Sequence, residues 1–305
     1  MTRMVTPGKA MLMGEYGVLF GGMALVMPTK QSAVCTYYHG PHYEFSSITS
    51  SLEFDNHHPL FLAVKQACNQ QSITAPWGSY ALDTQGFYKG TRKLGFGSSA
   101  AAIAALTKMI FFLQRIDNAD LLLRTALKAH QLFASGFGSG ADVATSMVGK
   151  PILFKTHDHL PHYEPINLFF TQDLFFIDTG RSQDTKLMVK QVMEFATHHT
   201  LFIDKFQKQA TLLCQEVLGA KNTEDVIRAI ESFYQLLDLL SARANMNIIS
   251  DEHRTIHDIA EHYQGTAKPS GSGGGDLALA LIPKTHRQDF IKAVDKAGFQ
   301  LVSAC

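Results

Sequence analysis

Apolar and polar positions along the chain follow two periods, and each period predicts a different kind of element. Apolar residues at helical spacing predict seven helices, at residues 58–70, 99–113, 119–133, 185–218, 223–240, 251–262 and 287–298. Short apolar runs between turn residues predict strands, at residues 17–27, 33–38, 43–47, 151–154, 168–178, 277–282 and 300–303. We expect the run at 17–27 to be broken at Gly21-Gly22 by a hairpin or a sharp bend.

The order of these elements predicts a mixed architecture of two domains. Helices and strands follow one another without a regular strand–helix–strand repeat, which favours an α+β fold. A polar segment that contains Pro and His, Lys155–Pro165, predicts a loop with a hinge between the halves. A chain of 305 residues is long enough for two domains, and we expect them at 1–165 and 166–305.

Composition narrows the classes of partner. The hydrophobic fraction is 46%, the charged fraction 18% and the formal net charge zero, as in many globular proteins and unlike nucleic-acid binders. No apolar run is long enough to cross a membrane, and residues 1–9 do not resemble a signal peptide. The four cysteines lie far apart without a C-x-x-C pair, so we expect no disulfide framework and a cytoplasmic setting. We expect a monomer or a homodimer.

The first glycine-rich stretch is Leu94–Ala101 (LGFGSSAA), which leads directly into an alanine-rich apolar helix. A glycine turn at a helix start directs free N–H groups and the positive end of the helix dipole at one point, which favours a bound phosphate. The spacing is not that of the G-x-x-x-x-G-K-[ST] phosphate loop. Tight packing of a capped helix is the alternative interpretation of this stretch.

Two further stretches combine glycine with hydroxyl or acidic residues. Residues 268–276 (KPSGSGGGD) precede an apolar run, which favours a buried strand there over a flexible linker. Residues 138–144 (GSGADVA) place Asp142 in a Gly/Ser turn, as either a catalytic carboxylate or an ordinary turn aspartate. The histidines within 157–162 match no standard spacing of metal ligands, so we expect no metal there.

These blocks, together with Pro7-Gly8-Lys9 and Gly14-Glu15-Tyr16, resemble in order and separation the motifs of the GHMP kinases. This family includes galactokinase, homoserine kinase, mevalonate kinase and phosphomevalonate kinase. The resemblance extends from Pro7 to about Ile282. It implies a two-domain GHMP kinase fold with the active site in the interdomain cleft. It also implies that the chain phosphorylates a small molecule with ATP and Mg²⁺.

Within the family, the chain is more similar to the phosphomevalonate kinases. Mevalonate kinases usually carry Gly-Glu-His at the first motif and four glycines at the third, where this chain has Tyr16 and Asp276. By contrast, residues 178–186 (DTGRSQDTK) resemble mevalonate kinases. The resemblance therefore implies phosphomevalonate as the acceptor and mevalonate as the alternative. A non-catalytic sensor that binds ATP or a metabolite is an alternative of another class.

The resemblance also implies roles for individual residues. Lys9 and Asp142 would be catalytic, with Asp142 orienting Lys9 and the acceptor. ATP would bind Lys93, Gly95, Phe96, Gly97, Ser98, Ser99, Ala100 and Ala101, and Mg²⁺ would bind Ser98 or Ser99. The acceptor would contact Glu15, Tyr16, Ser139, Arg181, Lys186, Ser270, Gly271, Gly273 and Gly274. The cations in or beside these motifs, which include Lys268, favour an anionic acceptor.

Overall fold

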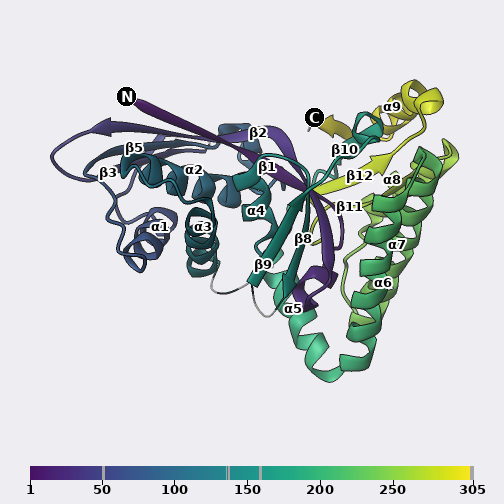
Figure 1. The fold of residues 1–305 in the computed structure, drawn as a ribbon. Coiled ribbons are helices and arrows are strands. Elements are labelled where there is room, and N and C mark those ends of the chain that lie inside the picture. The colour runs from purple at the N-terminus through teal and green to yellow at the C-terminus, as the bar shows by residue number, and fades with distance from the viewer. Residues whose placement is uncertain (50–51, 135, 137, 158–159, 303–305) are drawn as a thin grey trace. The chain divides into compact units, whose positions relative to one another are not determined.

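The computed structural model describes residues 1–49, 52–134, 136, 138–157 and 160–302 (Figure 1). The chain forms two compact units, a first unit of Met1–Lys9 with Pro28–Lys150 and a second unit of Ala10–Met27 with Pro151–Cys305. This division differs from the expected boundary after residue 165. Residues 10–27 belong to the second unit because Met23–Val26 pair with the strand that begins at Ile152.

The first unit combines a sheet with four helices. Its strands are β1 (Thr2–Met13, as far as Lys9), β4 (Leu52–Phe54), β3 (Glu44–Ile48), β5 (Gly78–Asp83) and the later part of β2 (Met23–His39). Its helices are α1 (Pro59–Asn69), α2 (Ser98–Leu113), α3 (Ala119–Phe133) and α4 (Ala141–Val148). Strands β3 and β5 run parallel, whereas β2 and β5 run antiparallel. The helices gather on one side of this sheet (Figure 1).

Helix α2 is the core helix of the first unit. Three quarters of its residues are buried, and it contacts α1, α3 and α4. A helix that is apolar on all sides is stable only where other elements surround it. Its alanines allow those neighbours to approach closely, so the alanine-rich sequence after the first glycine stretch fits the position it takes.

The second unit contains two groups of strands and the C-terminal helices. The start of β2 pairs with β8 (Ile152–His157), which pairs with β9 (Leu160–Pro165). A four-stranded antiparallel sheet has the order β11 (Thr266–Pro269), β12 (Leu277–Leu281), β10 (Leu174–Asp178) and β13 (Gln300–Val302). The helices are α5 (Thr185–His198), α6 (Thr200–Gly219), α7 (Thr223–Ala244), α8 (Asp251–His262) and α9 (Arg287–Lys296). Helices α7 and α8 both contact β11.

Some predicted elements were wrong. The expected hinge at Lys155–Pro165 is instead the β8–β9 hairpin, of which residues 158–159 lie outside the described chain. Its prolines are accommodated because β9 is an edge strand, where a missing N–H leaves no sheet neighbour unpaired. Residues Gly17–Phe20 form a 3₁₀ turn and not a strand. The helix predicted over 185–218 is two helices separated at His199.

Two observations on the described residues bear on the classes of protein considered above. No helix among them is long and apolar enough to cross a membrane. Cys35, Cys68 and Cys214 are buried free thiols, and burial raises the pKa of Cys35 and of Cys68 to about 12. The fourth cysteine lies outside the described residues.

Candidate active site

The first glycine stretch forms a tight turn that ends at the start of α2. Gly95 and Gly97 have positive φ angles of 85° and 76°, in the left-handed region that glycine adopts without strain. Gly97 is the N-cap residue and has no side chain that could accept the N–H groups of the first helical turn. The N–H groups of the first turn of α2 therefore have no cap from the Gly97 position, which is the geometry that the predicted phosphate site requires.

The predicted ATP-binding side chains take different positions around this turn. Ser98 lies in the first turn of α2 with 4% of its surface exposed, and Ser99 is half-buried. Phe96 is a core residue, so only its backbone is at the turn. Lys93 lies on a two-residue strand paired with Tyr88. The two serine hydroxyls are hard oxygen donors of the kind that Mg²⁺ accepts, so this donor set fits the ion.

Lys9 runs along the glycine turn. It lies within β1, and its backbone N–H donates to the carbonyl of Phe96 over 2.8 Å. A Cβ atom at Gly97 would lie 3.0 Å from both Cγ and Cε of Lys9. Glycine at this position therefore gives the lysine side chain the room it occupies against the turn.

Asp142 lies in the first turn of α4, and its side chain is 28% exposed. Burial alone would raise the pKa of this carboxyl. The charges of His130 and Lys9, together with hydrogen bonds from backbone N–H groups, lower the pKa by more than burial raises it. The net pKa therefore lies below its ordinary value, and Asp142 is an anion at neutral pH. The charge of Lys9 is one of the causes of this shift, so the Asp142 carboxyl lies within electrostatic range of Lys9.

Sequence reasoning missed His130 as a neighbour of Asp142. His130 lies in the last turn of α3, with Nε2 4.0 Å from Oδ2 of Asp142. Only its position twelve residues before Asp142, with a glycine turn between them, could have suggested it. Ser139 lies in that turn, and its hydroxyl accepts a hydrogen bond from Ala141 N–H over 3.3 Å.

In the second unit, the first and third motifs meet through a buried ion pair. Lys268 is fully buried, Glu15 is 1% exposed, and the Nζ of Lys268 donates to Oε1 of Glu15 and to the carbonyl of Pro269. Burial lowers the pKa of Lys268, and the charge of Glu15 opposes that shift. Lys268 is thus enclosed by protein, contrary to the expectation that it adds a cation for the acceptor.

The same motif residues hold the second glycine stretch. Glu15 Oε1 also accepts from Gly271 N–H over 3.4 Å, and the Tyr16 hydroxyl donates to the carbonyl of Ser272. Burial, followed by the charge of Glu15, raises the pKa of Tyr16, so its hydroxyl stays protonated. The Ser270 hydroxyl donates to the carbonyl of Met11 over 3.0 Å. Glu15, Tyr16 and Ser270 therefore shape the loop through hydrogen bonds of their own.

The loop is also packed on its other sides. Gly273 and Gly274 have positive φ angles, and a Cβ atom at Gly273 would lie 2.2 Å from the carbonyl oxygen of Ile248. Gly274 N–H donates to that carbonyl over 2.8 Å. Larger residues cannot occupy this approach, so the stretch is a fixed turn against the segment before α8 and not a linker.

Arg181 and Lys186 are the predicted acceptor-binding cations of the second unit. Both are exposed, and Arg181 Nε lies 2.7 Å from Oε1 of Glu252 at the start of α8. Lys186 follows Thr185, whose hydroxyl accepts from the Ser272 hydroxyl over 3.4 Å. Both cations therefore belong to segments that contact the glycine stretch.

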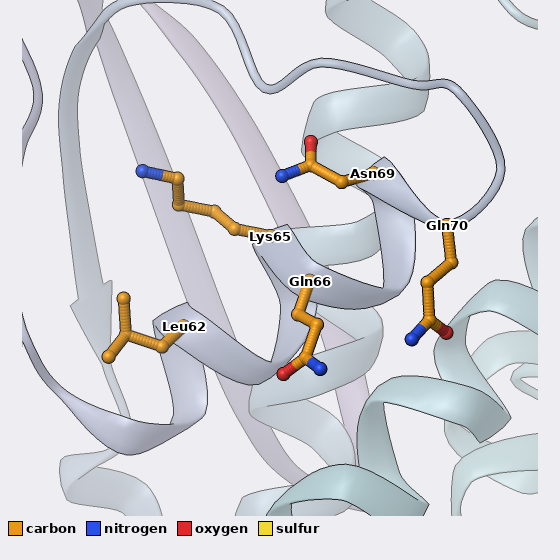
Figure 2. Close-up of a pocket in the computed structure, with 5 residues that line it drawn as sticks. All are labelled: Leu62, Lys65, Gln66, Asn69 and Gln70. Carbon is orange, nitrogen blue, oxygen red and sulfur yellow. The ribbon is translucent and has the colours of Figure 1, made fainter.

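A surface hollow in the first unit contains none of these residues. It has a volume of about 650 Å³ and is lined by α1 and its last turn, through Leu62, Lys65, Gln66, Asn69 and Gln70. Figure 2 shows these side chains projecting from one helix, without convergent charges. This hollow is no candidate for the phosphate chemistry that the motifs predict.

A cluster of possible metal ligands in the second unit is explained as an ion pair. Glu231, His257 and Glu261 place ligand atoms within 4.8 Å of one another. His257 Nε2 lies 2.8 Å from Oε2 of Glu231, and the ring stacks on Tyr234. Burial lowers the pKa of His257, but Glu231, Glu261 and Asp258 raise it above its ordinary value. The hydrogen bond between His257 and Glu231 accounts for the closeness of these groups.

Comparisons with known proteins agree with the motifs. The chain is 25% identical over 302 residues to phosphomevalonate kinase of Saccharolobus solfataricus, covering 92% of this chain and 90% of that protein. It is 24% identical over 301 residues to mevalonate kinase of Archaeoglobus fulgidus, covering 97% of this chain and 98% of that protein. No protein-family model matches the chain.

A solved structure shows the same fold. Phosphomevalonate kinase of Streptococcus pneumoniae, in complex with phosphomevalonate and AMPPNP, matches with a TM-score of 0.86 and 18% identity. The match covers 100% of this chain and 99% of that one. The chain thus has the fold of the GHMP kinases and resembles them in sequence, with phosphomevalonate kinase and mevalonate kinase among its relatives.

Proposed function

We propose that the chain transfers the terminal phosphoryl group of ATP to the phosphate of 5-phosphomevalonate, giving ADP and 5-diphosphomevalonate. The relatives and structural neighbours are kinases, which supports the reaction class. Within the chain, the observation that carries the proposal is the group formed by Lys9, Gly97 and Asp142. A lysine packed along a phosphate-binding turn, with an ionised carboxyl beside it, suits phosphoryl transfer.

The chemical step needs no base when the acceptor is a phosphate. An oxygen of the acceptor phosphate attacks the terminal phosphorus of ATP and forms a new P–O bond. The bond from that phosphorus to the bridging oxygen breaks, and its electron pair leaves with ADP. A phosphate monoester has a second pKa of about 6, so the attacking oxygen is already anionic at neutral pH. The protein must instead hold two anions in line and spread positive charge over the transferring group.

Each predicted site residue of the first unit has a role in this proposal. The N–H groups of residues 95–101 bind the ATP phosphates, and Lys93 adds charge beside them. Lys9 contacts the transferring phosphoryl group, and Asp142 orients Lys9. Ser98 and Ser99 would hold Mg²⁺, which when bound neutralises charge on the ATP phosphates.

The acceptor belongs to the second unit in this proposal. Arg181 and Lys186 are exposed cations on segments that contact the glycine stretch, which supports an anionic acceptor. Glycines 271, 273 and 274 offer backbone groups at the same loop. Glu15, Tyr16 and Ser270 act on the acceptor by fixing this loop. Ser139, in the first unit, is a further candidate hydroxyl for the acceptor.

Mevalonate is the second candidate acceptor, because the Archaeoglobus relative is a mevalonate kinase and residues 178–186 resemble that subfamily. The attacking group would then be a hydroxyl, and Asp142 would have to accept its proton. A sensor without turnover is not favoured. Binding alone gives no reason to hold an ionised carboxyl beside Lys9.

The test is ADP release by the purified protein with Mg-ATP, comparing 5-phosphomevalonate and mevalonate at equal concentration. We expect turnover on 5-phosphomevalonate, and Lys9→Ala serves as the control for contaminating ATPases. Turnover on mevalonate alone would keep the ATP site and replace the acceptor. Binding of ATP without turnover on either compound would contradict the proposal and support the sensor.

A further inference from the structure

Asp276 joins the glycine stretch to the loop that carries Arg181. Its N–H donates to the carbonyl of Arg181 over 2.8 Å, and its carbonyl accepts from Thr179 N–H and from the Thr179 hydroxyl, each over 3.0 Å. Its carboxylate Oδ1 accepts from Gln183 N–H over 3.4 Å. The loop is therefore held on both sides of Arg181, by backbone bonds at Thr179 and Arg181 and by the Asp276 side chain at Gln183.

The approach of these two segments is close. A Cβ atom at Gly275 would lie 3.2 Å from the carbonyl oxygen of Arg181, and Gly274 lies against the Gln183 side chain. Asp276 itself has a positive φ of 55°, which aspartate tolerates better than most residues other than glycine. Aspartate is therefore accommodated at a position that suits glycine, and from there its carboxylate reaches Gln183 N–H.

A second carboxylate holds the Arg181 side chain. Arg181 is 61% exposed, whereas its partner Glu252 is 16% exposed and lies in the first turn of α8. The bond from Nε to Glu252 uses one edge of the guanidinium, which has five N–H donors. An arginine fixed in this way can meet a planar or tetrahedral anion with little loss of rotamer freedom.

We infer that Asp276 and Glu252 are positioning residues that hold Arg181 for an anionic acceptor, and that Asp276 sets the preference for a phosphorylated acceptor. This inference rests on the proposed function. Glycine at 276 would keep the backbone bonds of that residue but lose the carboxylate bond to Gln183 N–H. The Arg181 loop would then be fixed on one side only. Both candidate acceptors carry a carboxylate, and 5-phosphomevalonate adds a phosphate of about two negative charges, so its binding depends on the Arg181 loop more than binding of mevalonate does.

The experiment compares the full chain with Asp276→Gly, Asp276→Asn and Glu252→Ala. We expect Asp276→Gly to raise KM for 5-phosphomevalonate about tenfold, as loss of a hydrogen bond to a charged group would, with KM for ATP unchanged. Asp276→Asn keeps an acceptor oxygen and should largely restore KM. Glu252→Ala should raise the same KM, and the ratio of turnover on 5-phosphomevalonate to mevalonate should fall in both weakened variants.

A matched control separates positioning from stability. Gln264 has a φ of 59° at the opposite end of β11, so Gln264→Gly is the same kind of change away from the loop. We expect Gln264→Gly to leave both KM values unchanged. Neither glycine variant should lower Tm, because glycine adopts a positive φ without strain.

The outcomes distinguish this inference from the function on which it rests. A wild-type chain without turnover on 5-phosphomevalonate overturns the proposed function. Normal turnover by the wild type, with an unchanged KM in Asp276→Gly, overturns only the role of Asp276. An equal rise of KM in Asp276→Gly and Gln264→Gly would show general loosening of the unit and would also overturn it.

Discussion

Lys9 in the first unit and Lys268 in the second both belong to motifs of the sequence, but the two side chains differ in how far the structure buries them. Each lies on a strand within a matched motif, and each has an acidic neighbour, Asp142 for Lys9 and Glu15 for Lys268. Lys268 is enclosed and donates to Glu15 and to a carbonyl. Lys9 is half-buried and lies along a glycine turn. Access to solvent, and not membership of a motif, separates the two lysines, because Lys9 is partly exposed and Lys268 is enclosed.

The largest expected effect is on stability at Lys268. Lys268→Met leaves Glu15 buried without its partner, so we expect the free energy of unfolding to fall by about 3–5 kcal/mol, measured by urea denaturation. Adding Glu15→Gln removes the uncompensated charge and should recover part of the loss. A Lys268→Met variant that is as stable as the wild type but has lost turnover would contradict the structural role of Lys268 and identify it as a catalytic cation.

Lys9 should show the opposite behaviour. We expect Lys9→Ala to lower kcat by about 10²–10³-fold, the usual effect of removing one group that stabilises developing charge. The free energy of unfolding should change by less than about 1 kcal/mol, because the side chain is only half-buried. Lys128→Ala, at an exposed lysine on α3 of the same unit, is the control. Equal kcat values in the two variants would remove Lys9 from the catalytic group.

Asp142 tests what the acid beside Lys9 does. If it orients Lys9, Asp142→Asn should lower kcat with 5-phosphomevalonate by less than about tenfold, whereas loss of a general base costs about 10²–10⁴-fold. Because the pKa of Asp142 lies below its ordinary value of 3.8, the rate should not fall with its protonation between pH 8 and pH 5. Because the acceptor phosphate itself takes up a proton near pH 6, the pH profile of the wild type is compared with that of Asp142→Asn, and the two profiles should be parallel. A loss of the larger size in Asp142→Asn would identify a base.

The smallest expected effect extends the comparison to two buried histidines of α8, of which one has a raised pKa and the other a lowered pKa. The raised pKa of His257 means that its stabilisation is complete below the unfolded pKa of about 6.5 and is lost as pH rises through the folded pKa. Burial lowers the pKa of His253 to about 4, so stability at that residue falls as pH drops from about 6.5 toward 4.

Thermal unfolding between pH 4 and pH 8 measures both contributions. We expect His257→Gln to weaken the decline of Tm above about pH 6.5 and to leave the decline below it intact. A Tm profile that His257→Gln leaves unchanged on the alkaline side would mean that the Glu231 ion pair adds nothing to stability.

Local patterns predicted local structure well. The spacing that predicted α3 gave both of its ends correctly, and Asn118 caps its start. The α+β fold, the GHMP kinase resemblance and the kinase class are also confirmed. Strand β5 was missed because it begins at a glycine, which weakens the strand pattern. The hinge expected at Lys155–Pro165 was wrong because edge pairing outweighed its polar composition.

Contacts between distant residues could not be predicted from one sequence. Glu15 and Lys268 are 253 positions apart, and no periodicity indicates that their charges meet in the interior. The hydrogen bonds between Asp276 and residues 179–183 likewise join residues that are more than ninety positions apart in the sequence. The roles of Lys9, Asp142 and the acceptor-binding residues stay predictions, since they depend on ligands and not on the fold alone.

The division of β1 and β2 between the units has a consequence for cutting the gene. The chain changes unit after Lys9, after Met27 and after Lys150. Three covalent connections therefore join the two units, whereas two consecutive domains are joined by a single linker. A fragment that begins at Pro151 would lack Met23–Val26 and leave the edge of β8 that faces β2 without partners. No single cut therefore yields two self-sufficient pieces, and shuffling this protein with a relative has to exchange residues 10–27 together with the C-terminal half.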